Sequence, residues 1–133
     1  MPKITVLDNE RATLWFHPEP GIVHHQFKKY VYGDDLKTVL NQGCDQMRTN
    51  GATKWLSDDR NNSALRSEDT EWVQNDWTPR VLAAGWKYWA IVLPQNVIGQ
   101  MNMKRFIDLS AETGVKVQVF DNPDEALRWL ESV

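Results

Sequence analysis

Cysteine is almost absent from this chain, because Cys44 is the only one among 133 residues. A single thiol excludes an internal disulfide and a zinc site built from several cysteines. Long apolar runs are missing too: none approaches the length that crosses a membrane, and the start of the chain lacks the apolar stretch of a secretion signal. We therefore expect a cytoplasmic protein that has no membrane span and needs no metal or cofactor.

Positive charge is not in excess either. The chain carries 15 Lys and Arg against 18 Asp and Glu, which gives a formal net charge of −3. Nucleic-acid phosphates bind to basic surfaces, so nucleic acid is not an expected partner. A hydrophobic content of 41% and a charged content of 25% are ordinary for a globular protein. The length suits one domain over residues 1–133.

What the chain has in excess is tryptophan. One interpretation is a small core that is filled by large rings, and the other is a groove or interface lined by some of them. The tryptophans are Trp15, Trp55, Trp72, Trp77, Trp86, Trp89 and Trp129.

Cys44 lies on an apolar helical stripe beside Leu40 and Met47 and is expected to be a buried, inert thiol.

Apolar periodicity divides the first half of the chain into strands and one helix. Alternating and β-branched runs predict strands, and the Pro-Glu-Pro-Gly sequence at 18–21 predicts a tight connection between two of them. Apolar residues at helical spacing then predict a helix that starts at 33–35 and ends at Asn50-Gly51. The expected strands cover 4–7, 12–17, 22–27 and 54–58.

The second half continues as alternating helices and strands. Ser67 is the predicted N-cap of a helix that Pro79 should kink or break and Gly85 should end. Residues 86–93 form the most hydrophobic run, which predicts a central strand buried on both faces. The remaining expected elements are a helix over 101–113, a strand over 115–120 and a helix capped by Asn122.

This order predicts an α/β fold. Its mixed sheet would begin with an antiparallel hairpin and grow by parallel βα additions, with about four helices. We expect these helices to cover one face, because the first hairpin has no helix of its own. The other face, with Trp15 and either His24 or His25, would then need a cover, which a homodimer could supply.

The densest polar cluster of the sequence follows the short strand that contains Trp55 and Leu56. In open α/β sheets, ligands collect where the carboxyl ends of strands meet helix N-termini. This cluster and the start of the next helix therefore mark the expected site. The predicted ligand- or partner-binding residues are Ser57, Asp58, Asp59, Arg60, Asn61, Asn62, Ser63, Trp72 and Trp77.

Asp58, Asp59 and Arg60 have two interpretations. Adjacent carboxylates at a strand end can bind a divalent cation or act in acid–base catalysis. Alternatively, an Asp bonds to nearby backbone N–H groups and Arg60 pairs with a carboxylate, so that the segment is structural. Because side chains alternate along a strand, the two aspartates should point to opposite faces.

The other polar candidates carry weaker signals. His24 and His25 should face opposite sides of the sheet and are expected to be structural, and His17 is expected to be exposed. Ser57 and Ser63 could be nucleophiles or phosphorylation sites, but neither lies in a nucleophile elbow or beside a triad.

Two methionines precede or open the predicted 101–113 helix. Met101 and Met103 follow the 86–93 strand, and the polar cluster follows a strand at the same end of the predicted sheet. They could form the floor of a pocket there, or they could fill the core.

The residues together resemble the SpoIIAA-like, or STAS/SEC14-like, domain family over nearly the whole chain. The resemblance implies the mixed α/β fold and a regulatory binding role. Anti-anti-sigma members of the family carry a phosphorylatable serine in Asp-x-Ser-Gly, whereas this region reads Asp58-Asp-Arg-Asn-Asn-Ser63 and lacks the glycine. The longer SEC14-type members enclose an apolar ligand pocket. The similar segments are 33–35, 55–60, 84–92, 119–121 and 126–130.

Two function classes follow. The first is a non-enzymatic domain that binds a protein partner or a small apolar ligand in a regulatory setting. The second is a small hydrolase or isomerase that uses Asp58, Asp59 and Arg60. A buried carboxylate in a closed cavity would favour the enzyme, and an open, flat polar surface would favour the binding domain.

Overall fold

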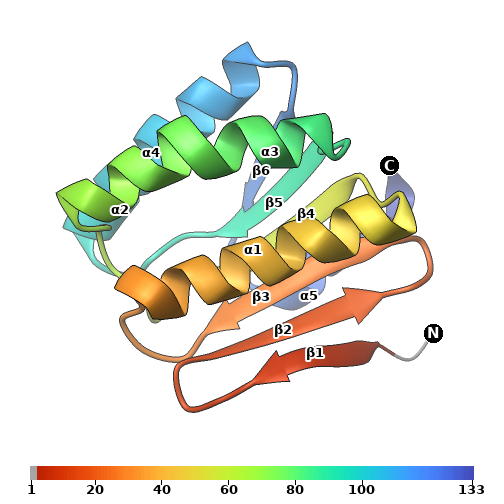
Figure 1. Ribbon diagram of the computed structural model, residues 1–133, viewed down its shortest axis with the longest axis horizontal. Coiled ribbons are helices and arrows are strands. Elements are labelled where there is room, and N and C mark those ends of the chain that lie inside the picture. Colours follow the sequence, from red (N-terminus) through yellow and green to blue (C-terminus); the bar gives the residue numbers. More distant parts are fainter. Residues whose placement is uncertain (1–2) are drawn as a thin grey trace.

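A six-stranded mixed sheet forms the centre of the structure, a computed structural model that describes residues 3–133 (Figure 1). The strands are β1 (Ile4–Asp8), β2 (Ala12–His17), β3 (Ile22–Phe27), β4 (Lys54–Asp58), β5 (Tyr88–Val92) and β6 (Lys116–Phe120). They lie side by side in chain order. β1, β2 and β3 pair antiparallel, and β3 to β6 pair parallel, which confirms the predicted mixed α/β fold.

Helices cover both faces of this sheet. They are α1 (Gly33–Asn50), α2 (Ser67–Trp72), the π-helical turn η1 (Val73–Trp77), α3 (Thr78–Ala83), α4 (Val97–Glu112) and α5 (Pro123–Ser132). Figure 1 shows α1 in front of the sheet and α5 behind it. The expectation that all helices cover one face is therefore wrong. The sheet has a second apolar face, where Leu56 and Ala90 pack with Ala126 and Leu130 of α5.

The larger core lies between the other face of the sheet and α1, α2, α3 and α4. Alternate residues of the strands enter this core because successive side chains of a strand point to opposite faces. Four tryptophans are buried in it: Trp55, Trp77, Trp86 and Trp89. Trp15, Trp72 and Trp129 are only half-buried.

Three helix ends differ from the prediction. Arg66, not Ser67, is the N-cap of α2, and it makes no capping hydrogen bond with its side chain. Pro79 does not break the helix, because it lies in the first turn of α3, directly after the π-helical turn η1. α4 begins earlier than expected, at Val97, because Asn96 caps it by accepting a hydrogen bond from the N–H of Gly99 at 2.6 Å.

Other element boundaries agree with the prediction. Gly51 follows the end of α1 with φ of 64°, a left-handed conformation that favours glycine. Asn122 caps α5 by accepting a hydrogen bond from the N–H of Glu125 at 2.9 Å. β5 lies inside the sheet between β4 and β6, one strand from the edge, and its residues from Trp89 to Val92 are buried.

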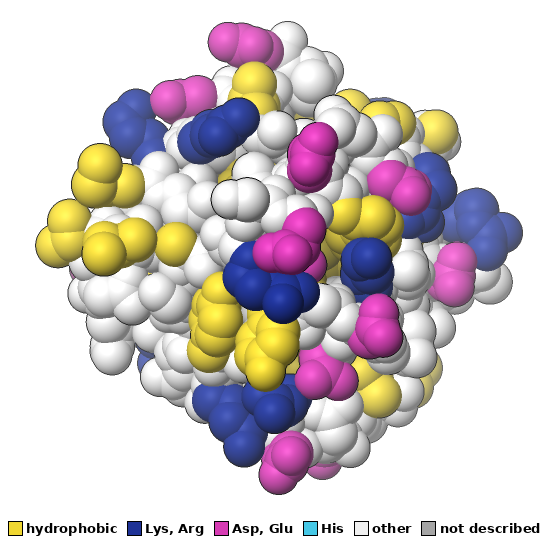
Figure 2. Space-filling model, turned by 60° about the vertical axis from the view of Figure 1, so that its left-hand side comes forward, with side chains coloured by type: hydrophobic (Ala, Val, Ile, Leu, Met, Phe, Trp, Pro, Cys, Tyr) yellow, Lys and Arg dark blue, Asp and Glu magenta, His cyan; other side chains and the backbone are white. Residues whose placement is uncertain are grey.

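Charged side chains of both signs are mixed over the face in Figure 2, and hydrophobic side chains form small groups among them. The most exposed large apolar side chains, Val97, Ile98 and Met101, lie at the start of α4. Among residues 3–133, no helix is both long enough and apolar enough to cross a membrane.

Candidate functional site

The candidate site lies at the carboxyl ends of β3 and β4. His25 on β3 is paired with Ser57 on β4, and Asp59 follows two residues later. Because strand side chains alternate, these three residues share the sheet face that α1, α2, α3 and α4 cover. Asp58 points to the face of α5 instead, which confirms that the two aspartates lie on opposite faces.

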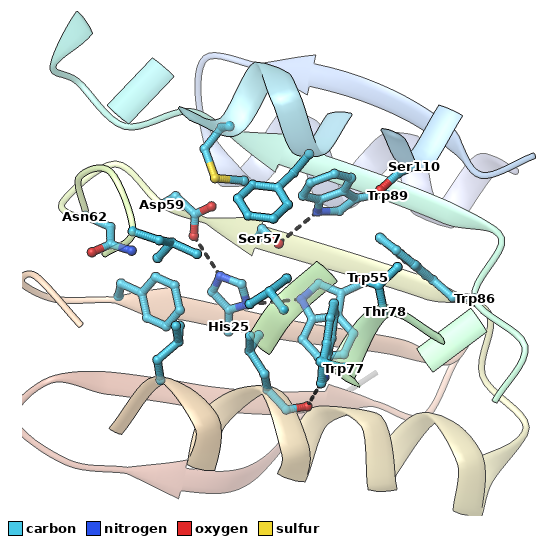
Figure 3. Close-up of a pocket in the computed structure, with 17 residues that line it drawn as sticks. His25, Trp55, Ser57, Asp59, Asn62, Trp77, Thr78, Trp86, Trp89 and Ser110 are labelled. Carbon is cyan, nitrogen blue, oxygen red and sulfur yellow. Dashed lines mark hydrogen bonds and ion pairs between the residues drawn. The ribbon is translucent and has the colours of Figure 1, made fainter. Parts of the chain in front are cut away.

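A cavity of about 70 Å³ lies above these residues (Figure 3). Its walls combine aliphatic and aromatic side chains, with Trp55, Trp77, Trp86 and Trp89 among the aromatic ones. Since one water needs roughly 10–15 Å³ by this kind of measure, the space is sufficient for a molecule of a few heavy atoms. The polar residues that line it are His25, Ser57, Asp59, Asn62, Thr78 and Ser110.

The four indole rings form a continuous row. Ring centroids lie 5.3 Å apart for Trp55 and Trp77, 6.0 Å for Trp77 and Trp86, and 5.4 Å for Trp86 and Trp89. The pairs are tilted or edge-to-face, the arrangements that the charge distribution of aromatic rings favours. Gly43 allows α1 to approach this row closely, because a Cβ at that position would overlap the ring of Trp55.

Hydrogen bonds fix three of the indoles. Trp77 Nε1 donates to the carbonyl oxygen of Leu40 at 2.8 Å, and Trp89 Nε1 donates to Ser57 Oγ at 2.8 Å. Trp55 Nε1 donates to His25 Nδ1 at 3.0 Å. Trp86 Nε1 is buried and has no hydrogen-bond partner within residues 3–133. The row is therefore held rigidly at three rings and has an unused donor at the fourth.

Hydrogen bonding also fixes the tautomer of His25. An indole N–H can only donate, so His25 Nδ1 must be the acceptor of the bond from Trp55. The ring proton therefore lies on Nε2, which donates to Asp59 Oδ1 at 2.7 Å. The side chains of His25 and Asp59 are only 4% and 5% exposed. Both ring nitrogens of His25 are thus used inside the protein.

Asp59 and Ser57 are among the polar groups at the cavity that keep unused hydrogen-bonding capacity. Asp59 Oδ1 accepts from His25, but in the described part of the chain no donor bonds to the second carboxylate oxygen, Oδ2. Ser57 Oγ accepts from Trp89, which leaves the hydroxyl proton of Ser57 available. In Figure 3, Ser57 lies next to Trp89, and Asp59 lies next to His25, on the side away from Trp86. A ligand in the cavity can therefore donate to Asp59 and accept from Ser57.

The other polar residues of the cluster form contacts within the protein. Asp58 is 2% exposed, and Arg60 donates to its two carboxylate oxygens from Nε and Nη2, both at 2.9 Å. These hydrogen bonds to Asp58 raise the pKa of Arg60 above its ordinary value. Asn62 accepts from the N–H of Val31 at 3.1 Å, and Ser63 accepts from Asn96 at 3.1 Å. Asp58 and Arg60 thus fit the structural interpretation.

Of the predicted site residues, the cavity brings together Ser57, Asp59, Asn62 and Trp77. Asp58, Arg60, Asn61, Ser63 and Trp72 do not line it. Asn61 is exposed, and Trp72 is half-buried at the surface, with Lys37 Nζ 5.5 Å from its ring centre.

Sequence reasoning missed several lining residues, above all His25, Trp55, Trp86, Trp89 and Phe106. The alternation of side chains along a strand could have identified His25, because His25 shares a sheet face with Ser57 and Asp59 once β3 and β4 are paired. Of the two methionines, Met103 lines the cavity and Met101 is exposed.

The prediction that His17 is exposed is wrong. His17 is buried, and its Nε2 lies 3.1 Å from Nδ1 of His24, which faces away from His25 as predicted. Burial lowers the pKa of His24 to about 3 and also lowers the pKa of His17. Cys44 is buried as predicted, and burial raises the pKa of its thiol.

No family model, curated protein or solved structure gave a significant match to the chain. In the described part of the chain, no three residues of His, Cys, Asp or Glu lie close enough together to hold a metal ion. The chemistry of the cavity is therefore the basis for a functional interpretation.

Proposed function

We propose that this chain is a non-enzymatic domain that binds a small, largely apolar molecule in the cavity between the sheet and the helices. The observation that carries the proposal is the combination of apolar, partly aromatic walls with unused polar groups, among them Asp59 Oδ2 and the Ser57 hydroxyl. Small-molecule sites are typically apolar pockets with a small number of placed polar groups. The cavity volume limits the bound part of the ligand to a few heavy atoms.

The enzyme alternative has one feature in its favour, the buried carboxylate of Asp59 at a cavity. Acid–base catalysis needs a group that can take up or release a proton at the substrate. Both nitrogens of His25 are bonded within the protein, and Arg60 is paired with Asp58 on the other face. Asp59 alone would have to carry the chemistry, so these bonds support binding over catalysis.

For the biological role, we propose only a general class. A mixed sheet with an antiparallel start and parallel βα additions is compatible with the SpoIIAA-like resemblance of the sequence, and with it a regulatory role in the cytoplasm. The homodimer stays a prediction, although helices cover parts of both faces. Light scattering at high protein concentration tests it, and the mass of a single 15.4 kDa chain would contradict it.

The binding proposal is tested with 2-propanol as a probe, since it combines an apolar body with one hydroxyl. Nitrogen–proton spectra recorded during a titration should show saturable shifts of the indole N–H signals of Trp55, Trp77 and Trp89. The Thr78→Phe variant, which places a ring at the cavity wall, should lose these shifts. Thr70→Phe is the matched control, because Thr70 is also half-buried on this helical segment but does not line the cavity. Unchanged or unsaturable wild-type signals would reject the proposal.

A further inference from the structure

We infer that the ligand of this cavity is a small organic cation, an amine or a methylated ammonium ion, whose charged group contacts Asp59. This inference rests on the proposed function and names the chemical class of the ligand. Three independent features of the site lead to it: a buried carboxylate with no Lys or Arg partner, a neighbouring histidine whose two hydrogen bonds fit its neutral form, and a group of indole rings.

The first feature is that Asp59 lacks a cationic partner. Its side chain is 5% exposed, and its hydrogen-bond partner within residues 3–133 is His25. The adjacent Arg60 pairs with Asp58 on the opposite face of the sheet and is not available to Asp59. Removing a carboxylate from water is costly unless it is paired and hydrogen-bonded. A cationic ligand would supply the missing partner.

The second feature is that His25 cannot become that partner without losing a bond. A charged imidazole carries a proton on both nitrogens. Protonation of Nδ1 would set its N–H against the N–H of Trp55, whose Nε1 lies 3.0 Å away and can only donate. The indole therefore favours the neutral ring with its proton on Nε2. His25 orients the Asp59 carboxylate by one hydrogen bond and leaves its charge uncompensated.

The third feature is the aromatic wall. Cations are attracted to the faces of aromatic rings, most strongly to tryptophan, and cages of such rings recognise quaternary and methylated amines. Trp55, Trp77, Trp86 and Trp89 all line the cavity in which Asp59 lies. Methyl groups of an ammonium ion suit these walls, while its charge suits the carboxylate. An anion would be repelled by Asp59, and a purely apolar ligand would leave its Oδ2 without a donor.

Three probes of similar size separate charge from packing. Isopropylammonium, 2-propanol and acetate each have four heavy atoms arranged in a fork and carry a positive, zero and negative charge. A ligand of four heavy atoms is expected to bind with a Kd of about a millimolar, so titrations followed by the indole N–H signals suffice. We expect isopropylammonium to bind at least about tenfold more tightly than 2-propanol, and acetate not to bind.

The contribution of the carboxylate is tested with Asp59→Asn, which keeps an oxygen that can accept the hydrogen bond from His25. This variant should bind isopropylammonium and 2-propanol with similar affinity. Asp121→Asn is the matched control, because it changes the net charge by the same amount at an exposed position. It should bind all three probes as the wild type does.

The outcomes distinguish the two proposals. If none of the probes binds the wild type, the proposed function fails. If 2-propanol binds but isopropylammonium binds no more tightly, the cavity is a ligand site and the cation inference is wrong. The comparison of the three probes on the wild type decides this even if Asp59→Asn does not fold. If Asp59→Asn and Asp121→Asn lose the same affinity for isopropylammonium, the net charge of the protein explains the effect. This result would also reject the inference.

Discussion

At the scale of single residues, neighbouring side chains of the polar cluster after β4 have different roles. Asp58 and Asp59 are adjacent in sequence and both nearly fully buried, but they belong to opposite faces of β4 and its extension. Asp58 is saturated by Arg60, whereas Asp59 keeps one oxygen free at the cavity. Asp58 should therefore contribute to the stability of the fold and Asp59 to ligand binding, and substitutions can measure the two contributions separately.

Arg60→Ala should lower the free energy of unfolding by about 2 kcal/mol, because it leaves the buried carboxylate of Asp58 without its two hydrogen bonds. Because the Arg60 side chain is 34% exposed, the loss should stay below that of a fully buried pair. Arg48→Ala is the control, since its ion pair with Asp45 is well exposed and should contribute less than about 0.5 kcal/mol. Urea denaturation of both variants measures the difference, and equal small losses would contradict the structural role of Arg60.

His24 predicts a dependence of stability on pH. Its pKa is lowered to about 3 in the folded protein, mainly by burial, from the ordinary histidine value of about 6.5. The unfolded chain therefore takes up a proton first as the pH falls below about 6.5, which favours unfolding. Stability from this residue is complete above that pH and is lost progressively as the pH falls toward 3.

Between pH 7 and pH 5 this residue should cost roughly 1–2 kcal/mol of the free energy of unfolding. Urea denaturation at several pH values measures the slope. His24→Gln should flatten it, because the amide cannot titrate yet its oxygen can still accept a hydrogen bond from His17. An unchanged slope in His24→Gln would assign the pH dependence to other groups.

At the scale of elements, the close approach of α1 to the sheet depends on Gly43. Gly→Ala inside a helix is ordinarily stabilising by roughly 0.5–1 kcal/mol. At Gly43 the added Cβ would overlap the ring of Trp55, which is fully buried and bonded to His25, so Gly43→Ala should instead destabilise by about 2 kcal/mol. Thermal unfolding measures this loss.

Comparison with Gly51→Ala separates two causes of lost stability, steric overlap of the added Cβ and an unfavourable backbone conformation. Gly51 has φ of 64° but no atom within 4 Å of an added Cβ, so only the left-handed backbone should cost stability, about 1 kcal/mol. A Gly43→Ala protein as stable as the wild type would mean that α1 shifts easily, and the cavity with it.

Most elements were predictable from sequence because their signals are local. Alternation marks β2 and β6, and the caps at Gly51 and Asn122 lie within one turn of the helix ends they fix. The side on which α5 packs was not predictable, since it depends on how the apolar residues of β4 and β5 divide between two faces. Likewise, Ser57 and Asp59 stand in an obvious polar cluster, but His25 joins them only through the pairing of β3 with β4.

At the scale of the whole molecule, the cavity implies a conflict between binding and stability. Asp59 is buried without a cationic partner, which is unfavourable in the empty protein. Asp59→Asn removes that charge and keeps an acceptor for His25, so we expect the free energy of unfolding to rise by about 1 kcal/mol, as is common when a functional site is neutralised. For a chain of this size, the Tm should rise by roughly 3–5 °C.

Calorimetry without ligand checks this expectation, with Asp121→Asn as the control. A lower Tm in Asp59→Asn than in the control would mean that the carboxylate stabilises the empty protein and that its role is structural.

The row of indoles also gives the molecule an optical property. Four chromophores with centroids 5.3 to 6.0 Å apart, held at fixed angles, are close enough for their electronic transitions to mix and for excitation to migrate along the row. The near-ultraviolet circular dichroism of the folded chain should therefore contain a coupled signal that separate tryptophans do not give. A molecule that enters beside the rings would change this coupling, so occupancy could be read directly from the unlabelled protein.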